Sequence, residues 1–272
     1  MSNHVNILFC NFATLKMKLA IMIIMNKQDR AVLLRQLSEK YETADFLNGD
    51  PSWFMHQVKG KDNQEVMAFL ASVLSFGKRE LFLPKIQAML ENSGGQTADW
   101  IKDGKYHDDI ADNDSCYYRF YNNHMMLLFL DALKDILIEH GSIGAFAEKH
   151  AKRHTTLEVL EAFGGYFRER GIKGMVPSPH SSVAKRPCMF MRWMVRDGSP
   201  VDLGLWSEFI DKRSLFIPLD THVMQEASHL GLIAGKTASW KTVMNLTEAL
   251  KEVFPDDPAK GDFALFGYGV DK

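Results

Sequence analysis

The chain has 272 residues, of which 46% are hydrophobic and 24% charged, and its formal net charge is −2. These proportions are typical of a soluble globular protein. The length is sufficient to bury a sizeable core, either in one large domain or in two small lobes. Three well-separated cysteines without a CxxC pair argue against a disulfide framework or a four-cysteine metal site, and they favour a reducing, cytoplasmic location. The ten histidines include no HExxH motif, so we expect neither a metal nor a cofactor.

The first 25 residues differ in character from the rest. Apolar runs at residues 7–12 and 19–25 are separated by Lys16 and Lys18, and neither run reaches the length of a membrane span. No small-residue cleavage site follows, which argues against a signal peptide. We therefore expect no membrane association. We interpret residues 1–25 as an extension, either an over-extended start or a loose tail, ahead of one domain over residues 26–272.

Hydrophobic periodicity predicts helices through nearly all of this domain. Apolar residues recur at helical spacing in five stripes, over residues 66–74, 127–137, 157–167, 189–194 and 223–230. Glycine follows four of these stripes, at positions 77, 141, 171 and 231, and predicts where those helices end.

The C-terminal part continues this helical pattern. Residues 240–254 have helical periodicity, and Asp257 followed by Pro258 predicts the N-cap and first position of a last helix. Alternating strand patterns and Asn-Gly hairpin turns are missing from the sequence. We therefore predict an all-α fold of about ten helices.

Positive charge is concentrated in one stretch. Residues 149–196 contain ten Lys and Arg against three acidic residues, a balance of +7, which leaves −9 for the remainder. One interpretation is a phosphate-binding surface, which requires such a basic stretch on an otherwise acidic protein. The other is a solvated basic face without a ligand, which has the same composition. Both interpretations stay open at this point.

An aspartate in residues 216–223 (FIPLDTHV) is the first candidate for chemistry. Pro218 forces an extended approach, and Asp220 then opens an amphipathic helix that ends near Gly231. One interpretation is an ordinary helix N-cap. The functional alternative is a carboxylate held rigidly at a cleft, where it stabilises a cationic sugar or activates a nucleophile.

A basic helix start in residues 177–194 is the second candidate. A polar turn with His180, Ser181 and Ser182 leads into a helix that opens with Lys185 and Arg186. The backbone N–H groups of such a turn, together with a helix N-terminus, form a phosphate cradle. The alternative is a solvated loop between two helices.

Several segments resemble the helix–hairpin–helix superfamily of DNA glycosylases, in the same order over about 200 residues. Residues 65–90 resemble the opening helix pair, residues 219–223 with 230–232 resemble the signature around the catalytic aspartate, and residues 257–259 with 264–267 resemble the closing helix. Arg186 and residues 189–196, 204–206 and 262–267 look closer still to a bacterial family of conserved hypothetical proteins within that superfamily.

The resemblance implies an all-α fold in two lobes, with a helix–hairpin–helix-like element and a central cleft for a base extruded from the DNA stack. By position, Asp220 is the carboxylate that assists cleavage of the N-glycosidic bond. Lys185 matches the lysine with which bifunctional members attack the sugar, and its alternative role is a phosphate contact. The expected DNA contacts are Arg186, Ser181, Ser182, His180, Lys78 and Arg79. Lys78 and Arg79 occupy the position at which members of the superfamily often have residues that probe the gap left by a flipped base.

The sequence departs from the superfamily in three respects. The glycine-rich hairpin is absent, and residues 177–184 stand in its place. Lys185 and Asp220 are 35 residues apart, a spacing more like that of the archaeal 8-oxoguanine glycosylase branch. The C-terminal four-cysteine iron–sulfur loop of the endonuclease III branch has no counterpart.

Aromatic residues are candidates for the walls of a base pocket, because their faces stack on any base. Tyr117, Tyr118, Phe120 and Trp193 are such candidates, and the alternative for each is a place in the core. His222 lies within the same motif as Asp220 and is a candidate for positioning Asp220 and for lining the base pocket; the alternative is a helix-surface histidine satisfied by a neighbour.

These observations predict a DNA N-glycosylase of base excision repair, a monomeric hydrolase acting on duplex DNA with a damaged or unusual base. Two alternatives stay open: a non-catalytic DNA-binding module of the same fold, and an enzyme that uses the cleft for a nucleoside or phosphorylated metabolite. Convergence of Lys185 with Asp220 in an open cleft favours chemistry, whereas a cleft filled by side chains favours binding alone.

Overall fold

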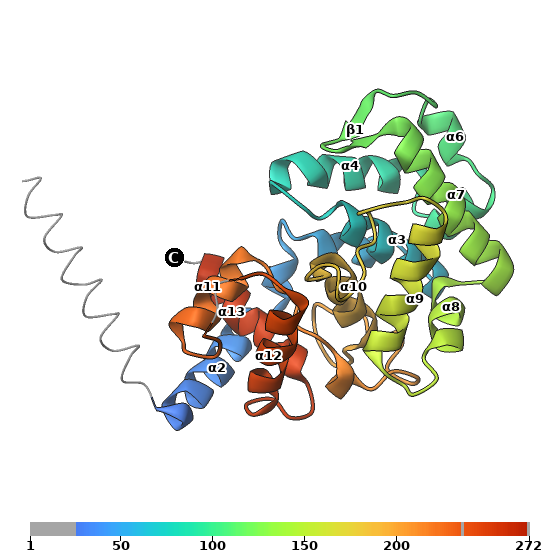
Figure 1. The fold of residues 1–272 in the computed structure, drawn as a ribbon. Coiled ribbons are helices and arrows are strands. Elements are labelled where there is room, and N and C mark those ends of the chain that lie inside the picture. The colour runs from blue at the N-terminus through green and yellow to red at the C-terminus, as the bar shows by residue number, and fades with distance from the viewer. Residues whose placement is uncertain (1–25, 235–236, 271–272) are drawn as a thin grey trace, which may run out of the picture.

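The computed structural model describes residues 26–234 and 237–270. Residues 1–25, which the sequence analysis interprets as an extension, lie outside the described part of the chain. The described part is almost entirely helical, which confirms the predicted all-α class (Figure 1). Its α-helices are α2 (Lys27–Tyr41), α3 (Lys61–Leu74), α4 (Arg79–Asn92), α5 (Thr97–Lys102), α6 (Tyr106–Asp109), α7 (Asn123–His140), α8 (Ile143–His150), α9 (Thr156–Glu169), α10 (Lys185–Val195), α11 (Thr221–His229), α12 (Trp240–Lys251) and α13 (Gly261–Val270).

Shorter elements complete the fold. The described residues also form four 3-10 helices: η1 (Ala44–Leu47), η2 (Pro51–His56), η3 (Lys212–Ser214) and η4 (Pro258–Lys260). A small antiparallel hairpin, β1 (Cys116–Tyr118) and β2 (Tyr121–Asn122), precedes α7. The sequence pattern did not predict this hairpin, because strands of three and two residues are too short for a periodic signal. No described helix combines the length and apolar character needed to cross a bilayer.

The helices form two groups with α10 between them (Figure 1). One group contains α3 to α9. The other joins the two ends of the described chain, because α2 packs along α13 and α13 packs against α11. Helix α10 packs against α3 and α9. Residues from both groups can therefore meet beside α10.

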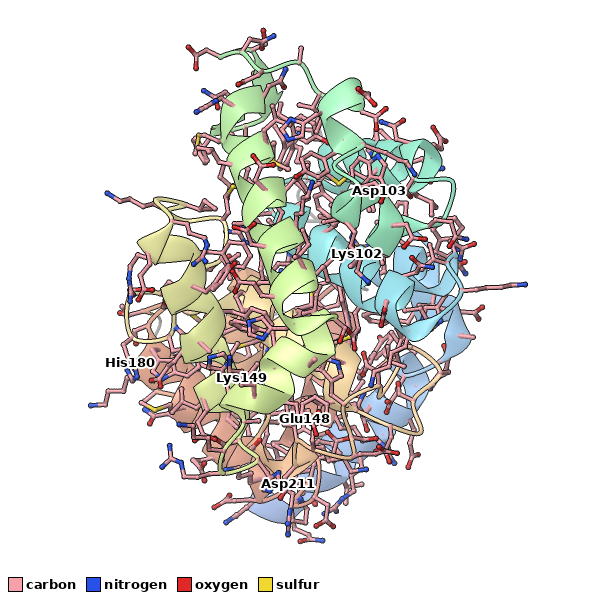
Figure 2. The ribbon with its side chains drawn as sticks, turned by 90° about the vertical axis from the view of Figure 1, so that its right-hand side faces the viewer. Lys102, Asp103, Glu148, Lys149, His180 and Asp211 are labelled. Atoms are coloured by element: carbon pink, nitrogen blue, oxygen red, sulfur yellow. The ribbon has the colours of Figure 1, made fainter. Side chains whose placement is uncertain are left out.

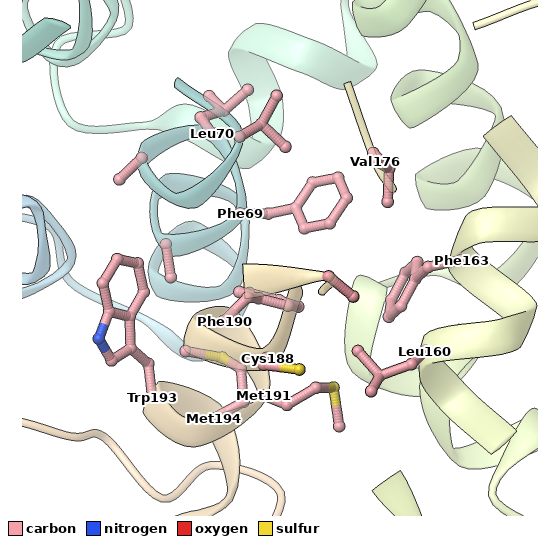
Figure 3. Packing of buried hydrophobic residues seen from close by; sticks show 14 of the residues in the cluster. Phe69, Leu70, Leu160, Phe163, Val176, Cys188, Phe190, Met191, Trp193 and Met194 are labelled. Atoms are coloured by element: carbon pink, nitrogen blue, oxygen red, sulfur yellow. The ribbon is translucent and has the colours of Figure 1, made fainter. Parts of the chain in front are cut away.

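The predicted apolar stripes form the core. Phe69 of α3 is buried, and its ring lies 5.4 Å from that of Phe163 in α9 and 5.0 Å from that of Phe190 in α10 (Figure 3). Fully burying one such side chain contributes about 2–3 kcal/mol to folding. The same packing fixes the orientation of α10 relative to α3.

Helix ends follow the predictions in part. Gly141 is the C-cap of α7, with φ +86°, a conformation that glycine adopts without strain. Asp257 differs from its prediction, because its side chain does not cap the short helix η4. Its carboxylate accepts hydrogen bonds from Arg196 instead. An ion pair with a distant arginine has replaced the local cap.

Candidate active site

A cavity of about 360 Å³ lies between the two groups of helices. This volume is within the range of small-molecule sites, roughly 300–1,000 Å³. The cavity is open, so the predicted cleft is not filled by side chains. Its lining includes three cationic side chains, three carboxylates and several aromatic rings, namely Arg79, Lys185, Arg192, Asp50, Asp220, Asp262, Phe46, Phe76, Phe82 and Phe266.

Asp220 is held at the cavity by the start of α11. The preceding segment is extended, and the N–H group of Ile217 donates to Thr247 Oγ1 of α12 at 3.2 Å. Pro218 lines the cavity, and Leu219 is buried. Asp220 is the N-cap of α11, and its Oδ1 accepts the Val223 N–H at 2.9 Å. One carboxylate oxygen is thereby used by the helix, and Oδ2 remains for other contacts.

Lys185 reaches the same point from the first turn of α10. Its Nζ lies 3.0 Å from Asp220 Oδ2, a charge-assisted hydrogen bond. The Lys185 side chain is 33% exposed and that of Asp220 14% exposed, so both remain accessible from the cavity. The structure thus brings together the two residues that the sequence singled out as catalytic candidates.

A second carboxylate lies deeper in the cavity. Asp262 of α13 is buried and accepts a hydrogen bond from Arg192 of α10. Desolvation by burial, with a smaller contribution from the nearby Asp220 carboxylate, raises the pKa of Asp262 to about 6, against the lowering effects of Arg192 and Lys185. Arg192 also pairs with Asp202 at 3.2 Å. The back wall of the cavity is therefore a buried ionic network rather than an apolar surface.

The loop between α3 and α4 closes another side. Arg79 lines the cavity and donates to Asp50 Oδ2 at 3.2 Å, while Asp50 Oδ1 accepts the Ser52 N–H. Lys78 is 76% exposed beside it, 3.9 Å from Glu80. His222 is exposed and lines the cavity next to Asp220. Arg79 and His222 thus line the cavity and Lys78 precedes Arg79 beside it, while their predicted roles in DNA contact and in positioning Asp220 stay predictions.

The structure corrects the prediction for Arg186. Its guanidinium donates to the backbone carbonyl oxygens of Val73 and Gly174 and to the Tyr121 hydroxyl, and it lies 4.8 Å from the centre of the Phe76 ring. These bonds join α10 to α3, to the hairpin and to the loop after α9. Arg186 therefore stabilises the fold and does not present its guanidinium to a phosphate.

The polar turn before α10 is also engaged internally. The hydroxyl groups of Ser181 and Ser182 both donate to the Ser178 carbonyl, and the Ala184 N–H donates to Ser182 Oγ. His180 lies 3.3 Å from Glu161. None of these three predicted DNA contacts lines the cavity. Their hydrogen bonds shape the loop, so the Ser181 and Ser182 hydroxyl protons are engaged within it, and the predicted phosphate cradle of backbone N–H groups stays a prediction.

The predicted base-stacking residues are not in the cavity wall. Trp193 is fully buried, and Tyr118 is 4% exposed, with its hydroxyl donating to the Phe76 carbonyl. Both belong to the core, as does the largely buried Tyr117 at its edge. Phe120 is 76% exposed at the tip of the hairpin. The aromatic rings that do line the cavity are Phe46, Phe76, Phe82 and Phe266.

The basic stretch is only partly a surface feature. Arg192 and Arg196 are buried, and Arg196 pairs with Glu42 at 2.7 Å. Lys149 lies on a face with side chains of both signs, beside Glu148 (Figure 2). The excess of positive charge counted from the sequence therefore overstates the basic surface that the fold presents.

Sequence reasoning missed Asp262, Arg192 and Asp50 as cavity residues. A signal existed for the first, because Asp262 is the only Asp, Glu, Lys or Arg in the apolar segment 261–270. Arg192 likewise interrupts an apolar stripe of α10. Among the described residues, no group of three or more His, Cys, Asp or Glu side chains is suited to a metal ion.

Comparison with known proteins gives one match. Residues 50–271 match the model of a family described as a protein of unknown function, DUF2400. No curated protein and no solved structure matches the chain. The matched residues include every side chain of the cavity named above except Phe46. The chain belongs to the DUF2400 family.

Proposed function

We propose that this chain is a DNA N-glycosylase of the helix–hairpin–helix type that releases an extruded base in base excision repair. The observation that carries the proposal is the pairing of Lys185 Nζ with Asp220 Oδ2, 3.0 Å apart at an open cavity. The order of the motifs that resemble that superfamily agrees with it.

The geometry of Asp220 suits cleavage of an N-glycosidic bond. The departing base takes the electron pair of the bond, and positive charge develops on the sugar. A carboxylate fixed by a backbone N–H and by Lys185 stabilises that charge without reorganising. Water then bonds to the sugar carbon and gives its proton to Oδ2 of Asp220, while the departing base takes a proton from solvent water. Asp220 afterwards returns its proton to the solvent, which restores the carboxylate. The products are the free base and an abasic sugar.

The cavity also suits a nucleobase. The rings of Phe46, Phe76 and Phe266 provide apolar faces, and Arg79 and Asp262 provide a donor and an acceptor. Aromatic faces stack on any base, whereas fixed polar groups distinguish the edges of different bases. Lys185 orients the carboxylate from the cavity wall through its contact with Asp220 Oδ2.

The test is a screen of the purified full-length chain against duplexes that each contain one oxidised, alkylated, deaminated or mismatched base. We expect release of a free base from at least one lesion class, detected by mass spectrometry. Parallel reactions contain the free nucleosides of the same bases. Binding of duplexes without release supports the non-catalytic module, and cleavage of nucleosides alone supports the small-molecule enzyme; either result contradicts the proposal.

A further inference from the structure

The tip of the β1–β2 hairpin presents an aromatic ring to solvent. Tyr118 and Tyr121 are paired across the strands, so that Arg119 and Phe120 form the two-residue turn. Phe120 is 76% exposed, the largest fraction among the exposed large hydrophobic side chains of the described residues. Exposure of a Phe ring at a turn gives no stability to the fold.

The hairpin below this tip is firmly anchored. The rings of Tyr118 and Tyr121 lie 4.9 and 5.3 Å from the ring of Phe76, and the Tyr121 hydroxyl donates to the Gly174 carbonyl at 3.2 Å. Arg186 donates to the same hydroxyl. The hairpin is therefore tied to α10 and to the loop before α4, and it holds Phe120 away from the core.

The tip stands at the rim of the cavity. Phe76 and Gly77 line the cavity, and Arg119 lies 5.6 Å from the centre of the Phe76 ring. A Cβ atom added at Gly77 would collide with the Arg119 guanidinium. Arg119 in turn lies 5.3 Å from the Phe120 ring. A continuous path of contacts thus leads from the cavity wall to the exposed ring.

The backbone of Arg119 is strained. Its φ is +53°, the left-handed region in which a turn ordinarily has glycine. Strain of this kind is common in segments that contact ligands. An arginine at this position directs a cation alongside the exposed ring.

Cationic side chains lie near the tip, although Asp114 adjoins the base of the hairpin and Glu80 lies beside Lys78. Arg119 and Lys78 are exposed, and Lys85 of α4 lies 4.9 Å from the Tyr117 ring. Exposed cations interleaved with an exposed aromatic ring suit nucleic acid, in which phosphates alternate with stacking faces.

We infer that the Arg119–Phe120 tip is a second nucleic-acid contact, in which Phe120 inserts into an interrupted base stack of duplex DNA while Arg119 contacts the adjacent phosphate. The inference rests on the proposed function, because it takes the DNA beside the cavity as the ligand. Apolar side chains that enter a base step are known wedges, and a step that has already lost one base costs less to open.

The experiment compares binding of two labelled duplexes, one intact and one with a tetrahydrofuran abasic-site analogue, by fluorescence anisotropy. We expect the wild type to prefer the abasic duplex. Phe120→Ala should weaken binding to that duplex at least about fivefold and leave binding to the intact duplex within twofold. Phe120→Tyr should keep the preference. Ile138→Ala, at a 62% exposed position of α7, is the matched control and should change neither affinity.

The outcomes separate the two proposals. Equal affinities of the wild type and Phe120→Ala for the abasic duplex overturn the inference while leaving base release intact. A Phe120-dependent preference without base release from any lesion supports the inference and contradicts the proposed function. Absence of DNA binding by the wild type contradicts both. Phe120-dependent binding to anionic phospholipid vesicles in place of DNA overturns the inference in favour of a membrane surface.

Discussion

The Nζ atom of Lys185 lies 3.0 Å from Oδ2 of Asp220, although 35 residues separate them in the chain. One residue stands in the first turn of α10 and the other is the N-cap of α11. Packing of α10 between the two groups of helices brings these termini together at the cavity. A paired ammonium and carboxylate at an open cavity is the arrangement on which the following predictions depend.

Replacement of Arg186 by alanine should destabilise the fold rather than merely weaken DNA binding. The guanidinium donates to two backbone carbonyl oxygens and to the Tyr121 hydroxyl, and these acceptors lose a charged donor. We expect a loss of about 3 kcal/mol in the free energy of unfolding, measured by urea denaturation. Arg168→Ala, at an exposed position of α9, is the control and should change it by less than about 0.5 kcal/mol. Equal stability of the two variants would show that the Arg186 contacts contribute nothing.

Lys78 is the better test of a phosphate contact. Its side chain is 76% exposed beside the cavity. Each phosphate contact contributes about 0.9 to the slope of log affinity against log salt concentration. Lys78→Ala should reduce that slope by about this amount for all duplex sequences. Lys149→Ala, on the face of Figure 2, should leave the slope unchanged, and an equal effect of both variants would argue against a localised DNA contact.

Asp262 should make stability fall as the pH rises. Desolvation raises its pKa in the fold to about 6 from the ordinary value of 3.8, so between these pH values the folded chain binds a proton that the unfolded chain has lost. The free energy of unfolding of the wild type, relative to Asp262→Asn, should therefore decrease by about 2 kcal/mol from pH 4 to pH 6, and it should stay nearly constant above pH 7. A relative stability that increases over this window would mean that Arg192 outweighs desolvation.

Borohydride trapping distinguishes the two roles of Lys185. The Nζ atom of Lys185 is engaged in an ion pair with Asp220 Oδ2, and a nitrogen engaged in this way is not available for attack on the sugar. We therefore expect no covalent protein–DNA adduct when borohydride is present during base release. Lys185→Ala should weaken DNA binding and leave slow base release measurable. An adduct formed by the wild type and absent from Lys185→Ala would identify Lys185 as a nucleophile.

The sequence predicted the features that depend on local pattern. The α3 stripe around Phe69, the glycine end of α7 at Gly141 and the helix start at Asp220 each follow from spacing over a few residues. The position of Asp220 relative to Lys185 depended on tertiary packing, and the resemblance to known motifs was what pointed to the pair.

Features that depend on distant partners were predicted less well. Whether Arg186 points outward or inward is decided by the carbonyl groups of Val73 and Gly174, which belong to other elements. Asp257 has the local pattern of a cap, but a buried Arg196 takes its carboxylate. Asp257 pairs with Arg196 rather than capping the helix, because leaving the buried Arg196 without an opposite charge would cost several kcal/mol.

The most direct test of the account is the rate of base release by Asp220→Asn, measured in single turnover on a lesion duplex that the wild type cleaves. Asparagine still caps α11, so the free energy of unfolding should change by about 1 kcal/mol or less, and DNA affinity should stay within about threefold. The account predicts that base release falls at least about a hundredfold, because the negative charge facing the sugar is lost. An Asp220→Asn variant that is folded, binds the duplex and releases the base at nearly the wild-type rate would contradict the assignment of this cavity as the active site.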